Sequence, residues 1–101
     1  MKKYHPVAGT RLAELDTPVL FLDIEAVEKN YKAVAETYKN TSCKMRQHTK
    51  NIKSPLLALM QIWAGGTVGG VCTAKVAEAE VMVHSGVTDI LIPNQVVTRD
   101  K

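Results

Sequence analysis

The segment KMRQHTKNIKSP, residues 44–55, gathers four cationic side chains and one imidazole immediately before an apolar run. Alternation along a strand over 42–50 would put nearly all of this charge on one face, made up of Lys44, Arg46, His48 and Lys50. Lys50 would then end the strand, and the active sites of parallel α/β folds lie at the carboxyl ends of strands. A primary amine in that place is suited to forming a Schiff base with a carbonyl compound.

That chemistry requires an amine with a lowered pKa. A lysine amine has an ordinary pKa of about 10.4, so at neutral pH it is mostly protonated and a poor nucleophile. Neighbouring cations lower this pKa because a second positive charge disfavours the protonated form. Arg46, His48 and Lys53 are near Lys50 in the sequence, and we expect them to act in this way.

The pattern alone leaves two other interpretations of the basic segment open. It could be a solvated edge strand, since charged edges prevent unwanted pairing between sheets. It could also be a nucleic-acid-binding surface, in which basic residues contact phosphates. Aromatic residues do not interleave with the basic ones and make up only 5% of the chain, which weighs against nucleic acid.

Apolar spacing and helix-end signals predict the elements that position these residues. In chain order we expect a strand over 17–23, a helix over 24–40, a strand over 42–50, a helix over 55–64, a strand over 67–73, a helix over 74–85 and a strand over 89–94.

The helix ends carry recognisable residues. Asp23, Ser54 and Thr73 are expected N-caps, and Pro55 suits a first helical position. Gly65 or Gly66 would end the second helix and Gly86 the third. The helix over 55–64 has almost no charge, which predicts burial over much of its circumference, with Trp63 in the core.

Strands that alternate with helices indicate parallel βα units, and the strands from 67 onward are continuously apolar, as expected when both faces are covered. The predicted class is therefore α/β. A closed (β/α)₈ barrel takes about 250 residues, so this chain of 101 residues cannot complete one. We expect either a small open sheet or the first part of a longer protein, and the final strand without a covering helix favours the second.

Bulk composition excludes several classes of protein. Hydrophobic residues make up 46% of the chain, which indicates a globular protein, and the net charge of +3 is too small to imply a nucleic-acid or membrane partner. Cys43 and Cys72 do not form a disulfide framework, so a reduced, cytoplasmic setting is expected. The N-terminus has no apolar signal region, and the most apolar run, 55–64, is too short to cross a bilayer.

The stretch RQHTKNIKSP resembles the Arg-Pro-His-x-Lys-x-His-Lys-x-Pro segment of the D-threonine aldolase and D-serine dehydratase family. That family belongs to the alanine racemase-like, fold-type III enzymes that use pyridoxal phosphate. LDTPVLFLDIEAVEKN resembles the start of the family's sequences, and VCTAKVAEAEVMVHSGVTDILIPNQVV resembles the second βα unit and third strand. The resemblance runs from about Leu15 to the end of the chain.

The resemblance implies a (β/α)₈ barrel followed by a β-rich domain. Residues 1–15 would be a lead-in and 16–101 the first part of the barrel domain, with the rest of the barrel and the second domain absent. The strand at 18–22 would pair with that second domain. Lys50 would carry pyridoxal phosphate as a Schiff base, and Arg46 and His48 would point into the barrel mouth as further cofactor-binding residues.

The implied activity is the cleavage of a D-β-hydroxy amino acid to glycine and an aldehyde. D-serine dehydratase and amino-acid racemase activities are alternatives within the same family. A divalent metal would assist, bound by residues outside this chain, and the full-length protein would be a homodimer that binds neither nucleic acid nor membrane. The chain alone would be inactive.

The sequence departs from the family pattern at three positions. Gln47 replaces a proline, Ile52 replaces the second histidine of the motif, and Ala74 replaces a frequent glutamine. These changes leave the Schiff-base lysine in place and leave the substrate open. Cys72 at a strand end could face the cofactor, but a packing role as a small buried residue explains it better. Asn94 and Gln95 end the next strand and could reach a substrate, and a turn role explains Asn94 at least as well.

Overall fold

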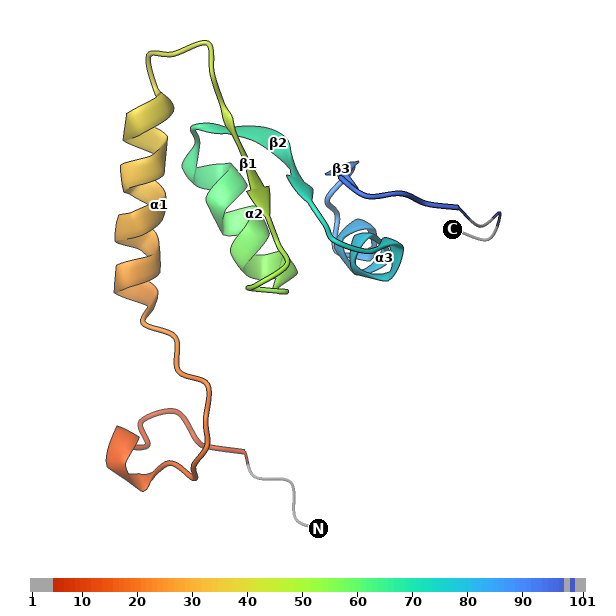
Figure 1. Ribbon diagram of the computed structural model, residues 1–101. Helices are drawn as coiled ribbons and strands as arrows, with labels where there is room; N and C mark the ends of the chain where they lie inside the picture. Colours follow the sequence, from red (N-terminus) through yellow and green to blue (C-terminus); the bar gives the residue numbers. More distant parts are fainter. Residues whose placement is uncertain (1–4, 98, 100–101) are drawn as a thin grey trace.

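The computed structural model describes residues 5–97 and 99 of the chain. Within them, helices and strands alternate after a short 3₁₀ turn, as Figure 1 shows. The elements are η1 (Leu12–Glu14), α1 (Ile24–Tyr38), β1 (Met45–His48), α2 (Pro55–Ala64), β2 (Thr67–Cys72), α3 (Val76–His84) and β3 (Asp89–Leu91). Residues 1–4 of the expected lead-in lie outside the described part.

The three strands form one parallel sheet in the order β1-β2-β3. Each strand lies beside the one that precedes it in the chain, as in a barrel, whereas the order reverses within a doubly wound sheet. The predicted α/β fold of parallel βα units is therefore confirmed. Figure 1 shows α1 at one end of the molecule and α3 at the other, with α2 and the sheet between them.

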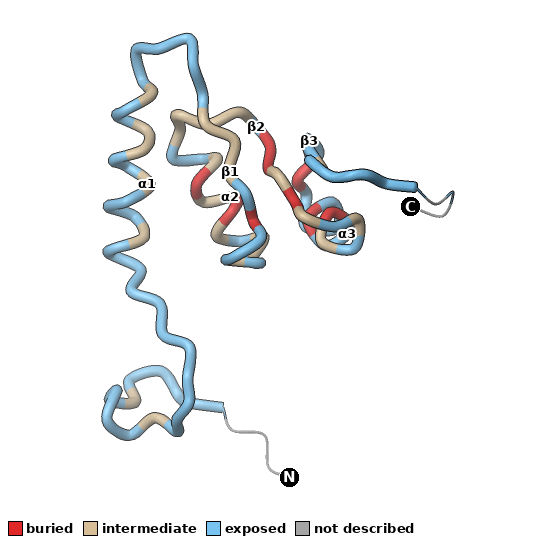
Figure 2. The backbone as a smooth tube through the Cα atoms, in the orientation of Figure 1, coloured by how far each residue is buried: buried red, intermediate tan, exposed pale blue. Residues whose placement is uncertain are grey.

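One small core joins the two connecting helices to the sheet. Ala58 of α2, Val71 of β2 and Met82 of α3 are buried together with Val87, which precedes β3. Figure 2 shows the buried stretches gathered on α2, β2 and α3 and their connections, while the N-terminal segment is almost wholly exposed. Because the Val71 side chain packs with residues of both helices, α2 and α3 cover the same face of the sheet and leave the opposite face open.

The predicted N-caps of the first two helices are confirmed, although α1 ends at Tyr38 and not at residue 40. The Asp23 carboxylate accepts a hydrogen bond from the Ala26 amide at 3.0 Å, and the Ser54 hydroxyl accepts one from the Leu57 amide at 3.4 Å. These side chains satisfy amide groups that have no partner inside a helix. Gly65 follows α2 with φ of 98°, a left-handed conformation that glycine adopts without steric cost.

The strand predicted over 17–23 is wrong. The segment before α1 is extended but pairs with no strand in the described part of the chain, and Leu20 is fully exposed. An apolar run of this kind becomes a strand only when another strand hydrogen bonds to its backbone groups. The family resemblance put that partner in a second domain, outside the described residues.

The burial predicted for α2 is also wrong. Only Ala58 and Gln61 of this helix are buried, and Trp63 is 70% exposed. The sheet covers one side of α2 and α1 touches another, but a groove of about 410 Å³ remains between the two helices, where Trp63 lies beside Tyr31 and Met60. The absence of charged residues from α2 therefore did not mean that other parts of the protein surround this helix.

Thr73 is not the N-cap of α3, because the helix begins two residues later than predicted. Lys75 occupies the N-cap position, and its side chain makes no capping hydrogen bond. The Thr73 hydroxyl is instead buried without a hydrogen-bond partner. β1 and β3 are also shorter than the strands predicted over 42–50 and 89–94, since β1 ends at His48 and β3 ends at Leu91. Gly86 does follow α3, with φ of 97°.

The described part of the chain is spread out. Its radius of gyration is 16.8 Å, whereas a compact domain of this length has about 13 Å. The difference reflects the open sheet face and the N-terminal segment, which extends away from the sheet in Figure 1. None of the described helices is long and apolar enough to cross a membrane.

Candidate active site

The open face of the sheet carries the polar residues singled out in the sequence. Val71 faces the helices, so its neighbours Gly70 and Cys72 face the open side. Gly70 pairs with Asp89, and Cys72 pairs with both His48 and Leu91. The open face therefore consists of layers across the strands, as barrel interiors do.

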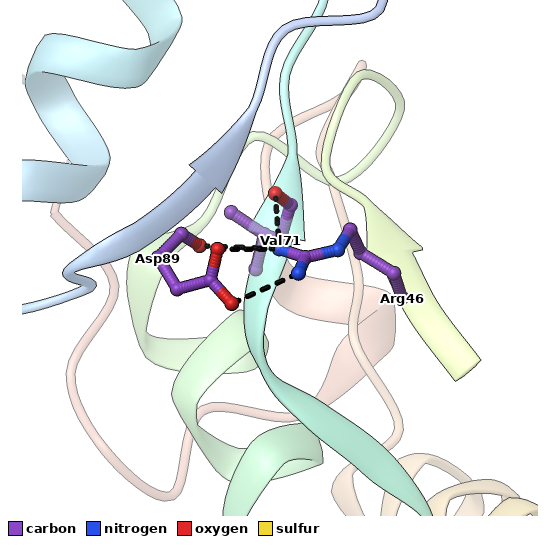
Figure 3. A network of polar contacts seen from close by, with 3 residues as sticks. All are labelled: Arg46, Val71 and Asp89. Carbon is purple, nitrogen blue, oxygen red and sulfur yellow. Dashed lines mark hydrogen bonds and ion pairs between the residues drawn. The ribbon is translucent and has the colours of Figure 1, made fainter. Parts of the chain in front are cut away.

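The deeper layer is a bidentate ion pair that spans three strands. Arg46 on β1 donates to both carboxylate oxygens of Asp89 on β3, at 2.9 Å from Nη1 and 2.8 Å from Nη2. Figure 3 shows the guanidinium lying across β2, where Nη1 also comes within 3.5 Å of the Val71 carbonyl oxygen. Gly70 makes this crossing possible, because a Cβ atom there would lie 2.7 Å from Nη1.

The ion pair changes the titration of both partners in opposite directions. The hydrogen bonds from Arg46 lower the pKa of the Asp89 carboxyl, and the hydrogen bonds to Asp89 raise the pKa of Arg46. Arg46 does lie on the face predicted from alternation, but its guanidinium is directed along the sheet to Asp89. Lys50 lies beyond the end of β1, on the turn that follows the strand.

The shallower layer brings His48 to the end of β1. Its imidazole is exposed, and Nδ1 accepts a hydrogen bond of 3.2 Å from the backbone amide of Lys50. The contact requires an Nδ1 atom without a proton and holds the ring beside the backbone of Lys50. His48 and Lys50 are thus neighbours at the carboxyl end of the strand, where their pattern predicted them.

Lys50 lies on a tight turn that follows β1. Thr49 is 1% exposed and is fixed to β2, since both its amide and its hydroxyl donate to the Cys72 carbonyl oxygen, at 2.9 and 3.1 Å. The Lys53 amide donates to the Thr49 carbonyl oxygen at 2.9 Å and closes the turn. Lys50 is exposed between these anchors, so its side chain is accessible to a ligand.

Lys53 has φ of 45°, a left-handed conformation that costs a non-glycine residue about 1–3 kcal/mol and persists only where surrounding contacts impose it. One such contact is an ion pair of 3.5 Å between its ammonium group and Glu78 on α3. Glu78 also accepts a hydrogen bond of 2.8 Å from the Ala74 amide. That backbone hydrogen bond, followed by Lys53, lowers the pKa of the Glu78 carboxyl.

Asp89 and Glu78 are the site residues that sequence reasoning missed. The argument from neighbouring cations counted the charges of Arg46 and Lys53 without the carboxylates that pair with them. An acidic residue at the start of an apolar strand was the available signal for Asp89. For Glu78 the signal was a glutamate three residues after the N-cap, whose side chain reaches back to amides at the helix start.

A cleft of about 540 Å³ adjoins this end of the sheet, between the start of α3 and the chain beyond β3. The Asn94 side chain connects the two sides of this cleft, because its amide donates a hydrogen bond of 2.8 Å to the Ala74 carbonyl oxygen. This contact ties the chain after β3 to the connection between β2 and α3. Asn94 thus positions backbone, as the turn interpretation of this residue implied.

The donors present fit an aldehyde cofactor, since an exposed amine just beyond a strand end can bond to a carbonyl carbon. The divalent metal expected from the resemblance would be bound by residues outside this chain, so it stays a prediction. Within residues 5–97 and 99, no group of three or more His, Cys, Asp or Glu side chains is arranged to hold a metal ion.

The known proteins that resemble this chain are named aldolases or dehydratases, although no family model matches the chain. The 3-hydroxy-D-aspartate aldolase of Paracoccus denitrificans is 38% identical over 88 residues, which are 87% of this chain and 22% of that protein. The D-threonine aldolase of an Arthrobacter species is 39% identical over 89 residues, 88% of this chain and 23% of that protein. The D-threo-3-hydroxyaspartate dehydratase of a Delftia species is 31% identical, over 79% of this chain and 20% of that protein.

A solved structure agrees with these relatives. The D-threonine aldolase of Filomicrobium marinum superimposes with a TM-score of 0.81 and 47% identity, over 89% of this chain and 24% of that one. The fold is thus the mixed α/β arrangement of the fold-type III enzymes, represented here by a parallel-sheet segment. The chain is therefore similar to these proteins over 79–89% of its length, and it spans about a fifth to a quarter of the length of the relatives it matches.

Proposed function

We propose that the protein containing this chain is a pyridoxal phosphate-dependent lyase that cleaves D-β-hydroxy amino acids in the manner of a D-threonine aldolase. The observation that carries the proposal is the accessible amine of Lys50 on an anchored turn at the carboxyl end of β1. The family relationship supports it, because relatives with 38–47% identity are named aldolases.

Each residue of the basic segment has a distinct role in this proposal. Lys50 provides the nitrogen that bonds to the cofactor's aldehyde carbon, and His48 contacts the Lys50 backbone amide. Arg46 links β1 to β3 across β2 through Asp89 and keeps the strand that presents Lys50 in place. When bound, pyridoxal phosphate supplies a ring that accepts the electron pair of the bond that is broken.

Reduction of the full-length protein with borohydride tests the assignment of Lys50. We expect the native protein to absorb in the visible range as a yellow cofactor complex and, after reduction, to carry the cofactor on the peptide containing Lys50. Lys50→Ala should lose the label, whereas Lys29→Ala on α1, outside the turn that carries Lys50, should keep it. A label on Lys53, or on no lysine, would contradict the proposal.

The proposed reaction releases glycine and an aldehyde, while a dehydratase releases a keto acid and ammonia. Assays of the full-length protein on D-threonine, D-3-hydroxyaspartate and D-serine, each with and without a divalent metal, separate these outcomes. We expect glycine from the first two substrates. Dehydratase activity is less favoured because the relative with that name shares 31% identity, below the aldolases.

The nucleic-acid interpretation receives little support from the geometry, because two of the cations that suggested it are paired with carboxylates. Binding of nucleic acid through the basic segment would weaken steeply with salt. A titration of the full-length protein with DNA and RNA from low to physiological salt should show no binding of this kind.

A further inference from the structure

The turn that presents Lys50 has two anchors with different properties. The first is Thr49, which is buried and bonded twice to the Cys72 carbonyl oxygen of β2. The second is Lys53, whose backbone conformation is left-handed and whose side chain reaches away from the turn to α3. Lys50 lies between them, so the position of its amine depends on both anchors.

Glu78 is the residue that the second anchor contacts. One carboxylate oxygen lies 3.5 Å from the Lys53 ammonium, and the other accepts a hydrogen bond of 2.8 Å from the Ala74 amide. Ala74 belongs to the connection that follows β2, whereas Lys53 belongs to the connection that follows β1. A single carboxylate therefore joins the two neighbouring strand-to-helix connections at the end of the sheet where Lys50 lies.

Global stability does not explain this arrangement. The Lys53 side chain is 67% exposed, and ion pairs with such an exposed partner contribute little to folding. The Glu78 side chain, in contrast, is only 19% exposed and bonds to fixed backbone. The Glu78 carboxylate is thus fixed in place and contacts an exposed Lys53 side chain whose backbone is left-handed.

We propose that Glu78 is a positioning residue for Lys50, and that it acts by holding Lys53 and so fixing the turn over 49–53 against the next strand-to-helix connection. The inference rests on the proposed function of Lys50 as the amine that bonds to the cofactor. Glu78 does not itself touch the reacting atoms in this account; it sets where the Lys50 amine is placed.

Two readouts on the full-length protein test the role of Glu78. The first is the rate at which the cofactor-free protein takes up pyridoxal phosphate on Lys50, measured by borohydride trapping and peptide mass spectrometry. The second needs no cofactor: acetic anhydride labels lysines competitively, and the labelling of Lys50 is expressed relative to Lys29 on α1.

Four variants separate charge, shape and backbone strain. Glu78→Gln keeps an oxygen for the Ala74 amide but removes the negative charge, and Lys53→Met removes the ammonium while leaving Glu78 intact. Lys53→Arg retains a cation, and Lys53→Gly accepts the left-handed backbone without one. Glu36→Gln is the matched control, because it removes the carboxylate of an exposed ion pair on α1, 3.7 Å from Lys39.

We expect uptake of the cofactor on Lys50 to slow about tenfold in Glu78→Gln, Lys53→Met and Lys53→Gly, since small misplacements of a reacting group have effects of this size or larger. Relative acetylation of Lys50 should change in the same three variants. Lys53→Arg should restore both readouts to near the native values, and Glu36→Gln should leave them unchanged.

The possible failures are distinguishable. If the native protein takes up no cofactor on Lys50, the proposed function is refuted and the positioning role with it. If the native protein does so, but Lys53→Met and Lys53→Gly behave like the native protein, Glu78 has no positioning role. Equal losses in Lys53→Arg and Lys53→Met would also overturn the inference, because the contact would then not depend on a cation.

Discussion

Replacement of Gly70 by alanine tests the cross-sheet ion pair directly. An added Cβ would lie 2.6 Å from Cγ of Asp89 and 2.7 Å from Nη1 of Arg46, and it would also collide with the Asp89 backbone oxygen. Favourable contacts between non-bonded heavy atoms lie near about 3.5–4.0 Å, so the neighbours would have to move by about 1 Å. The Arg46 side chain can rotate away, but the Asp89 backbone is hydrogen bonded within the sheet.

The expected cost follows from these displacements. Overpacking of this kind destabilises by about 1–3 kcal/mol, and a value near the upper end is expected because backbone must move. The gain from restricting the unfolded chain, about 0.4–1 kcal/mol, offsets only part of it. Gly69→Ala is the matched control, since a Cβ at the adjacent glycine meets nothing within 4 Å.

Urea denaturation of the full-length protein, followed by circular dichroism, measures both variants. Gly70→Ala should lower the free energy of unfolding, whereas Gly69→Ala should leave it unchanged or raise it slightly. Equal stabilities for the two variants would refute the reasoning, because they would show that Arg46 does not cross β2 in contact with Gly70.

Three further predictions concern single side chains. Ser54→Ala should lower the free energy of unfolding by about 1 kcal/mol, because the Leu57 amide at the start of α2 loses its capping oxygen; the same urea titration checks it. Thr73→Val should be neutral or stabilising, since it replaces a buried hydroxyl without a partner by a methyl group of similar shape; a fall in melting temperature would contradict this. The lowered pKa of Asp89 means that its contribution to stability is complete above the ordinary carboxyl pKa of about 3.9 and is lost as the pH falls through the lowered value. Asp89→Asn should therefore be less stable than the native protein at pH 7, with the difference shrinking in acid, and a gap independent of pH would exclude the ion pair as its cause.

Local features of this protein could be predicted from its sequence because their causes are local. The Asp23 and Ser54 caps bond to amides three residues away, so residue type and position sufficed. The alternation that put Arg46 and His48 on one face follows from strand geometry in the same way. The order of helices and strands was equally accessible, since each connection is short.

Features that depend on distant partners could not be predicted in this way. Asp89 is 43 residues from Arg46, and their contact depends on the strand order and on a register irregularity between β1 and β2. The segment over 17–23 has the composition of a strand but no partner in the described chain. Trp63 has the spacing of a core residue, yet its exposure depends on which other parts of the protein pack against α2.

The two layers on the open face of the sheet differ in role: one holds the strands together, and the other lies at the end of the sheet that carries Lys50. The scaffold layer, Arg46 with Gly70 and Asp89, lies deep in the sheet, while Cys72 and Leu91 lie one layer nearer the end that carries Lys50. Substitutions at Cys72 and Leu91 would therefore reshape the space beside the amine without touching the cross-sheet ion pair. A library intended to change substrate preference should vary these two positions and leave the three deeper residues constant.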